Sequence, residues 1–138
     1  MDLIPAVNIT ADALNAEKIR MEVISENIAH AQTTLQENGQ AYRRKEVTFE
    51  SYLDRTGGTP EERLRVASVS EDESPGKMLY MPTHPHANEE GMVEYPNVQI
   101  SREMVDLITA SRSYEANLTI LRTSKQMSEQ AMRIGRGA

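Results

Sequence analysis

The chain has 138 residues with one Phe, no Trp and no Cys, and its formal net charge is −6 at pH 7. The lack of Cys excludes disulfides, thiolate metal sites and a Cys nucleophile. The acidic balance argues against nucleic-acid binding, which normally needs a concentrated basic face. Apolar runs are too short for a membrane span, and no signal peptide is recognisable. We therefore expect a cytosolic protein, or one that leaves the cell without a cleaved signal.

Residues 8–35 are predicted to form the first long helix. Asn8 or Thr10 can cap its start, because a side-chain oxygen there accepts a free backbone N–H. Thr33-Thr34 and Asn38-Gly39 should end it. Apolar residues recur at every seventh position, and Ile24 and Ala31 each follow one of them by three; the row is Val7, Leu14, Met21, Ile28 and Leu35. This spacing is typical of a narrow coiled-coil seam.

Residues 36–97 differ in composition from the two ends, because they contain most of the Pro and Gly residues of the chain. Alternating apolar residues predict a first strand through Val47, Phe49 and Leu53, and a second through Leu64, Val66 and Val69, joined by a turn at residues 57–60. The basic run Arg43-Arg44-Lys45 is interpreted as a solvated strand edge. We expect a small β-rich or extended module between two helices.

Residues 98–133 are predicted to form the second helix, with Asn97 as its N-cap and a frayed tail after it. Such a helix is ~50 Å long and in so small a protein needs a partner helix. Its seam alternates four and three residues through Ile100, Met104, Leu107, Ser111, Tyr114, Leu118, Leu121, Lys125, Ser128 and Met132.

The predicted fold is mainly α, with two long terminal helices packed antiparallel in a coiled-coil-like pair. Residues 1–35 and 98–138 form the terminal helical domain, and residues 36–97 form the middle module. The residues expected in the assembly seam are Leu14, Met21, Ile24, Ile28, Met104, Leu107, Tyr114, Leu118 and Leu121. A core this poor in aromatic residues predicts a monomer that is only partly folded until it assembles.

His84-Pro85-His86 is the only pattern that suggests metal chemistry. It lacks a third spaced His or Cys, so an extended connector is the favoured interpretation, and metal binding by His84 and His86 stays open. The sequence has no nucleophile elbow and no phosphate-binding loop. We therefore expect neither a catalytic site nor a cofactor.

The two ends of the chain resemble the signatures of flagellar basal-body rod and hook proteins. Residues 13–34 are similar to the N-terminal signature, and residues 96–117 to the C-terminal one. Residues 82–85 and 91–98 resemble a segment typical of proximal rod proteins. His30, Asn88 and Met92 depart from the usual residues. The matching motif residues are Arg20, Asn27, Ala29, Thr33, Thr34, Pro96, Asn97, Asp106, Arg112, Glu115 and Asn117.

The resemblance implies a structural subunit of the proximal rod in the periplasm, with its paired helices lining the inner tube. It implies export by the flagellar type III system without a cleaved signal. The implied partners are copies of the chain itself, other rod proteins, adaptor proteins beside the MS ring and export gate, and the export gate.

Early substrates of this export system carry a Phe, three residues and then an aliphatic residue, a pattern that Phe49 and Leu53 match. Phe49 is equally interpretable as a core residue of a strand, and both roles are compatible. The competing hypothesis for the whole chain is a soluble helical adaptor or secretion-associated regulator that forms a closed oligomer. An enzyme is a third and weaker alternative.

Overall fold

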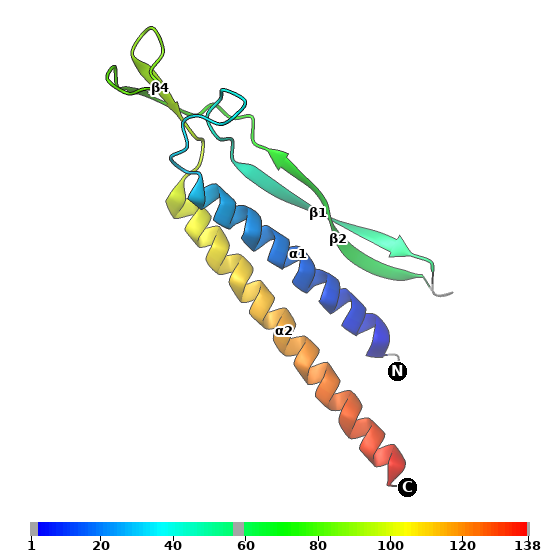
Figure 1. Cartoon of the computed structure of the whole chain (residues 1–138). Coiled ribbons are helices and arrows are strands. Elements are labelled where there is room, and N and C mark those ends of the chain that lie inside the picture. Colours follow the sequence, from blue (N-terminus) through cyan, green and yellow to red (C-terminus); the bar gives the residue numbers. More distant parts are fainter. Residues whose placement is uncertain (1–2, 57–59, 138) are drawn as a thin grey trace.

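The computed structural model describes residues 3–56 and 60–137. Two helices lie side by side and antiparallel, so that both chain ends point to one end of an elongated molecule (Figure 1). The elements in chain order are α1 (Leu3–Ala29), β1 (Lys45–Asp54), β2 (Glu61–Glu71), β3 (Lys77–Tyr80), β4 (Met92–Tyr95) and α2 (Ile100–Arg136). The strands form two separate antiparallel hairpins, β1 with β2 and β3 with β4.

The expected arrangement of two helices around a strand-containing insert is confirmed, but the strands make up more of the chain than "mainly α" suggests. α1 has 27 residues and α2 has 37. The longer hairpin, with strands of 10 and 11 residues, packs along α1 on the side away from α2 (Figure 1). α1 is therefore covered on two sides, whereas α2 packs against α1 alone among the described helices and strands.

The predicted end of the first helix was wrong, because α1 ends at Ala29 and not near residue 35. The predicted caps Asn8 and Thr10 were wrong as well, since α1 already begins at Leu3. After α1 the chain folds back through a turn in which Gly39 has φ +79°, a conformation that favours Gly. The Tyr42 N–H then bonds to the Thr33 carbonyl at 3.0 Å. Tertiary contacts of this returning segment thus end the helix earlier than local propensity does.

The predicted N-cap of the second helix was also wrong. α2 begins at Ile100, and the residue at the cap position is Gln99, whose side chain makes no capping bond. The Asn97 side chain is instead bonded to other segments of the insert. At its far end α2 continues through Arg136, three residues beyond the expected end, with Gly137 as its C-cap.

Both predicted strands of the longer hairpin are confirmed as β1 and β2. Val47 pairs with Val69, and a bulge between Thr48 and Phe49 shifts the register of the pairs that follow. A bidentate ion pair from Arg63 on β2 to Asp12 on α1, with Nε–Oδ2 at 2.5 Å, ties the hairpin to the helix. The turn expected at residues 57–60 lies outside the described residues except for Pro60.

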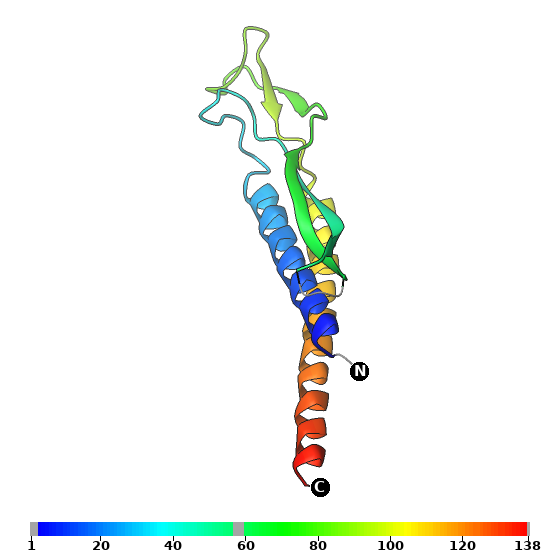
Figure 2. The same ribbon diagram turned by 90° about the vertical axis from the view of Figure 1, so that its right-hand side faces the viewer.

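The shorter hairpin, β3 and β4, stands at the end of the molecule opposite the chain termini (Figures 1 and 2). Gly76 lies directly before it, where a Cβ would fall 2.0 Å from the Tyr95 carbonyl oxygen. Only Gly permits this close approach of two backbone segments. Every residue of β3 is exposed, while Val93 of β4 is buried.

The contact between the helices uses small and polar residues of α2. Ala110 and Glu103 are fully buried, and the partly buried residues continue the four–three spacing through Leu107, Tyr114, Asn117, Leu121, Ser124 and Ser128. Four of the ten residues predicted for the seam of α2 are exposed in the single chain, namely Ile100, Met104, Lys125 and Met132. Met104, for example, is 52% exposed.

Replacing Ala110 by Leu should destabilise the helix pair, because Ala110 has no exposed surface and the larger side chain must push the helices apart. We expect a loss of about 1–3 kcal/mol in the free energy of unfolding, measured by urea denaturation and circular dichroism. Ala116→Leu, at an exposed position of the same helix, is the matched control and should change stability by less than about 0.5 kcal/mol. Equal stability of the two variants would contradict the observed helix contact.

Candidate functional site

A buried polar junction joins α1, α2 and the start of β1, and its centre is Asn27. The Asn27 Nδ2 donates to the Lys45 carbonyl at 2.9 Å and to Glu103 Oε2 at 3.1 Å. The Asn27 Oδ1 accepts from the Tyr42 hydroxyl and from the Lys45 N–H, both at 2.9 Å. These four bonds match the two donors and two acceptor sites of an amide. Asn27 is 0% exposed, so its full complement of partners keeps its burial from being costly.

Glu103 brings a carboxylate into the junction and is also 0% exposed. Its Oε1 accepts from Arg44 Nε at 2.5 Å, while its other oxygen accepts from Asn27. Arg44 pairs further with Glu46, and its Nη2 lies 3.7 Å from Asp106 Oδ2. Burial alone lowers the pKa of Arg44, but its bonds to Glu103 and Glu46 outweigh this, and the pKa is raised. The guanidinium therefore stays charged beside the buried carboxylate.

Tyr42 closes the junction from the segment that follows α1. Burial raises the pKa of its hydroxyl, and nearby carboxylates including Glu26 and Glu103 add to the effect. The hydroxyl thus remains a hydrogen-bond donor to Asn27. The Tyr42 ring stacks on the ring of His30, with centroids 4.8 Å apart. This stack orders the turn that leaves α1.

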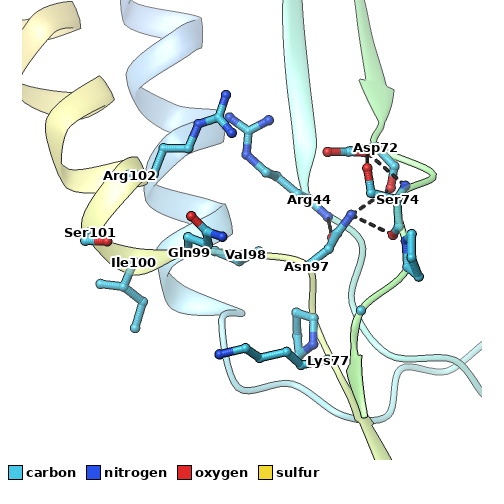
Figure 3. Close-up of a pocket in the computed structure, with 13 residues that line it drawn as sticks. Arg44, Asp72, Ser74, Lys77, Asn97, Val98, Gln99, Ile100, Ser101 and Arg102 are labelled. Atoms are coloured by element: carbon cyan, nitrogen blue, oxygen red, sulfur yellow. Dashed lines mark hydrogen bonds between the residues drawn. The ribbon is translucent and has the colours of Figure 1, made fainter.

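Asn97 holds the insert together beside the start of α2. Its Oδ1 accepts from the Arg44 N–H at 2.7 Å, and its Nδ2 donates to the carbonyls of Asp72 and Ser74 at 2.9 and 3.1 Å (Figure 3). These bonds border an open hollow of about 630 Å³. Arg102 and the segment from Val98 to Ser101 also line it (Figure 3). Asn97 therefore joins the segment before β1, the segment after β2 and the entry to α2 at one point.

The structure brings some of the predicted motif residues together and leaves others on the surface. Arg44 is the common neighbour of three of them. It contacts Asn97 and Asp106 directly, and Glu103 links it to Asn27. Thr33 and Thr34 bond to His rings, Arg20 pairs with Glu17 at 3.7 Å, and Pro96 is buried. Asn117 is half-buried in the helix contact, whereas Ala29, Arg112 and Glu115 are exposed.

Sequence reasoning missed three residues of the junction, namely Tyr42, Arg44 and Glu103. The interpretation of the run Arg43–Lys45 as a solvated edge was wrong for Arg44, whose side chain is only 13% exposed. The repeat of α2 could have indicated Glu103, because it lies seven residues before the fully buried Ala110. Nothing local in the sequence distinguishes Tyr42 from the other four Tyr residues.

The residues of the expected export signal lie on β1 in different surroundings. Phe49 is partly buried and lines a hollow of about 350 Å³ with Val23 and Ile24 of α1. Leu53 is 52% exposed. The core interpretation of Phe49 therefore has structural support, whereas the folded structure gives Leu53 little packing.

His84 is engaged in a hydrogen bond within its own loop, and His86 also contacts the segment that follows α1. The His84 Nδ1 accepts from the His86 N–H at 3.1 Å, and the His86 Nδ1 lies 2.8 Å from Thr34 Oγ1. Within residues 3–56 and 60–137, no group of three or more His, Asp or Glu side chains could hold a metal ion. Neither helix in the described part of the chain carries the apolar stretch that a bilayer crossing requires.

Comparison with known proteins assigns a family to this arrangement. Residues 89–134 match the family described as "Flagellar basal body rod FlgEFG protein C-terminal". The flagellar basal-body rod protein FlgC of Bacillus subtilis is 40% identical, over 95% of this chain and 97% of its own length. The chain belongs to the FlgC family of flagellar basal-body rod proteins. The FlgC protein of Borreliella burgdorferi is 38% identical, over 99% of this chain and 100% of its own length. The FlgC protein of Salmonella typhimurium is also 38% identical, over 98% of this chain and 99% of its own length.

The family resemblance expected from the sequence is thereby confirmed. The chain is a structural protein of the bacterial flagellum, located in the rod of the basal body. The polar junction lies where the segments of the N-terminal and C-terminal signatures meet, since Asn27 comes from the first and Glu103 from the second. The signatures of this FlgC family member are therefore parts of one structural site.

Replacing Asn27 by Asp should destabilise the fold, because the shape is kept while the amide donor facing Glu103 becomes a second carboxylate. We expect a loss of about 3–5 kcal/mol in the free energy of unfolding, measured in urea at pH 7. Asn15→Asp, at an exposed position of α1, is the matched control. The double variant Asn27→Asp/Glu103→Gln restores one donor between the two side chains and should recover part of the loss. No recovery in the double variant would show that the Asn27–Glu103 bond is not what the fold depends on.

Proposed function

We propose that the chain joins the proximal rod through its two terminal helices, while the insert between them holds the helix pair in register. In this proposal residues 1–35 and 98–138 form the assembly domain and residues 36–97 form a second module. The partners are further copies of the chain and other rod proteins. Contacts with adaptor proteins beside the MS ring and with the export gate belong to the same proposal, and no catalytic role is assigned.

The observation that carries this proposal is the large apolar surface that α2 leaves uncovered. Its first turns expose Ile100, Met104, Val105 and Ile108. Single chains rarely expose contiguous apolar patches of this kind unless another protein covers them. α2 has only one neighbouring helix in the monomer, and further subunits of the rod would supply the missing contacts. The seam residues Leu14, Met21, Ile24, Ile28, Leu107, Tyr114, Leu118 and Leu121 then support the helix pair from within and at its margins.

A charge at Met104 should block incorporation into the rod without unfolding the chain, because Met104 is half exposed in the monomer. We expect Met104→Glu to abolish swimming and to be missing from purified basal bodies, with an unchanged circular dichroism spectrum of the purified protein. Ser68→Glu is the matched control, since it adds the same charge at an exposed position of β2, which does not contact α2. Normal amounts of the Met104 variant in the rod would contradict the proposed role of this surface.

We further propose that the chain passes through the flagellar type III export gate in an unfolded state, and that Phe49 and Leu53 form the recognised pattern. The lack of Cys is compatible with such a route, because no disulfide can hold the chain folded. The exposure of Leu53 also fits, since packing in the folded state gives little reason for an aliphatic residue there.

Leu53→Ala should reduce export while leaving the fold intact, because the side chain is half exposed. We expect the variant to accumulate in the cell in soluble form, measured by immunoblotting of secreted and cellular fractions, and Phe49→Ala to behave likewise. Val69→Ala is the matched control, as Val69 is 47% exposed on the neighbouring strand of the same hairpin. Unchanged secretion of the Leu53 and Phe49 variants would leave Phe49 as a packing residue only.

A further inference from the structure

We propose that the shorter hairpin and the loop between its strands bind a soft monovalent metal ion, Cu(I) or its analogue Ag(I), through two thioethers and one imidazole. The ligands are Met78 of β3, His86 of the loop and Met92 of β4. All three line one open hollow of about 430 Å³ between this hairpin and the segment that follows α1. The site belongs to the single chain and does not depend on the proposed assembly into the rod.

The pairing of β3 with β4 places the two thioethers on the same face of the hairpin. Met78 lies opposite Glu94, and Met92 lies opposite Tyr80. Opposite residues share a face, and so do residues two apart on one strand, so Met78 and Met92 are diagonal neighbours that long side chains can connect. Met78 is 49% exposed, so packing within the chain gives little reason for a Met there. The three rotatable bonds of each Met allow its sulfur to adjust to an ion.

The loop between the strands brings His86 to the same hollow and holds it there. The Asn88 Oδ1 accepts from the Met92 N–H at 2.8 Å, and the Asn88 N–H donates to the Met92 carbonyl at 2.9 Å. The loop is thereby bonded to the start of β4 two residues after His86. The His86 Nδ1 lies 2.8 Å from Thr34 Oγ1. Among the described residues its Nε2 has no hydrogen-bond partner, so this nitrogen is available to an ion.

The contact with Thr34 determines which nitrogen of His86 can bind the ion. When the Nδ1–H donates to Thr34 Oγ1, the ring proton is on Nδ1 and Nε2 keeps its lone pair. Histidines that bind metals use their second nitrogen in this way, and the hydrogen bond fixes the orientation of the ring. His84 is a poorer ligand, because its Nδ1 accepts from the His86 N–H at 3.1 Å and its own proton is therefore on Nε2.

The chemistry of these ligands selects the kind of ion. Thioether sulfur is a soft, uncharged ligand that favours Cu(I), whereas Mg²⁺ and Ca²⁺ require oxygen ligands and Zn²⁺ is bound by thiolate, imidazole and carboxylate. The carboxylate that lines the hollow, Glu94, is already paired with Arg43, with Oε1 and Nη2 3.0 Å apart. Leu35, Pro85 and Ala87 line other parts of the hollow. A neutral, soft set of ligands in partly apolar surroundings suits an ion of low charge.

Competition with the Cu(I) chelator bicinchoninate, under anaerobic and reducing conditions, measures binding by the full, untagged chain. The chain has no Cys whose thiolate could bind the ion instead. We expect one Cu(I) per chain. Met78→Leu, Met92→Leu and His86→Gln should each weaken binding by more than about tenfold, because each removes a ligand and even an outer hydrogen-bond partner is worth about tenfold to 100-fold. Met81→Leu is the matched control, since it removes a thioether next to β3 that does not line the hollow.

The role of Thr34 as a positioning residue is tested in the same assay. Thr34→Val keeps the shape of the side chain but removes the oxygen that contacts His86, and it should weaken Cu(I) binding by about tenfold while one ion per chain still binds. Thr34→Ser keeps the hydroxyl and should restore the affinity.

NMR spectroscopy with Ag(I) gives a second and independent measurement. Ag(I) has the same soft character as Cu(I) and is not oxidised in air, so the methionine methyl signals can be followed through a titration. We expect the signals of Met78 and Met92 to shift and those of Met127, which is exposed on α2, to stay in place. This measurement uses the unaltered chain, so it does not depend on whether the variants fold.

Methyl shifts confined to Met78 and Met92, together with weaker Cu(I) binding in the three ligand variants, would establish the site. No binding, or binding that survives in all three variants, would overturn the proposal. So would shifts spread over the exposed Met residues, because these would show contact with any accessible thioether. Zn²⁺ binding of equal strength would also overturn it, since the thioethers would then not select the ion. Each result leaves the test of rod assembly at Met104 unaffected.

Discussion

The fold depends on one constraint, the burial of the Glu103 carboxylate between the two helices. An uncompensated charge there would be strongly destabilising, so Arg44 and Asn27 must both reach it. Arg44 arrives from the insert and Asn27 from α1, so the carboxylate can be satisfied only when all three segments are in place. Such a buried network contributes little net stability compared with an apolar core. We interpret its role as fixing which segments meet and in which register.

This constraint also explains what the sequence could and could not predict. The two helices and the strands β1 and β2 were predictable because their apolar periods are long and regular. The end of α1 was not, since it is determined by contacts with residues far along the chain, such as the stack of His30 on Tyr42. Asn97 looked like an N-cap by local rules, but the backbone groups it bonds belong to Arg44, directly before β1, and to Asp72, directly after β2. Local propensity carries no information about such distant partners.

The seam of α2 shows a second limit of pattern reading. Leu107, Tyr114 and Leu121 are partly buried, whereas the alternating positions were predicted one residue later, at Met104, Ser111, Leu118 and Lys125. In the structure Ala110 is fully buried, while Asn117 and Ser124 are partly buried, as are Ser111 and Leu118; a residue as small as Ala110 lets the helices approach closely. The spacing of the apolar residues predicts the repeat of the helix contact. Which face of α2 packs against α1 depends also on the volume of the side chains. Large apolar residues such as Met104 are thereby left for surfaces that a single chain cannot cover.

The molecule therefore has two ends of different character. Around Glu103 every polar group of Asn27 is satisfied and the segments are held by several bonds at once. Toward Arg136 the second helix has lost its partner, and its apolar residues face solvent. Local stability should fall along α2 in the same direction, because protection follows buried contacts. A subunit that is ordered at the junction and unpartnered at the tail keeps a defined shape while reserving one helix end for neighbours. In the proposed assembly, the covering of that end by a neighbour would be coupled to its ordering, because a helix end without a tertiary partner is marginal in water.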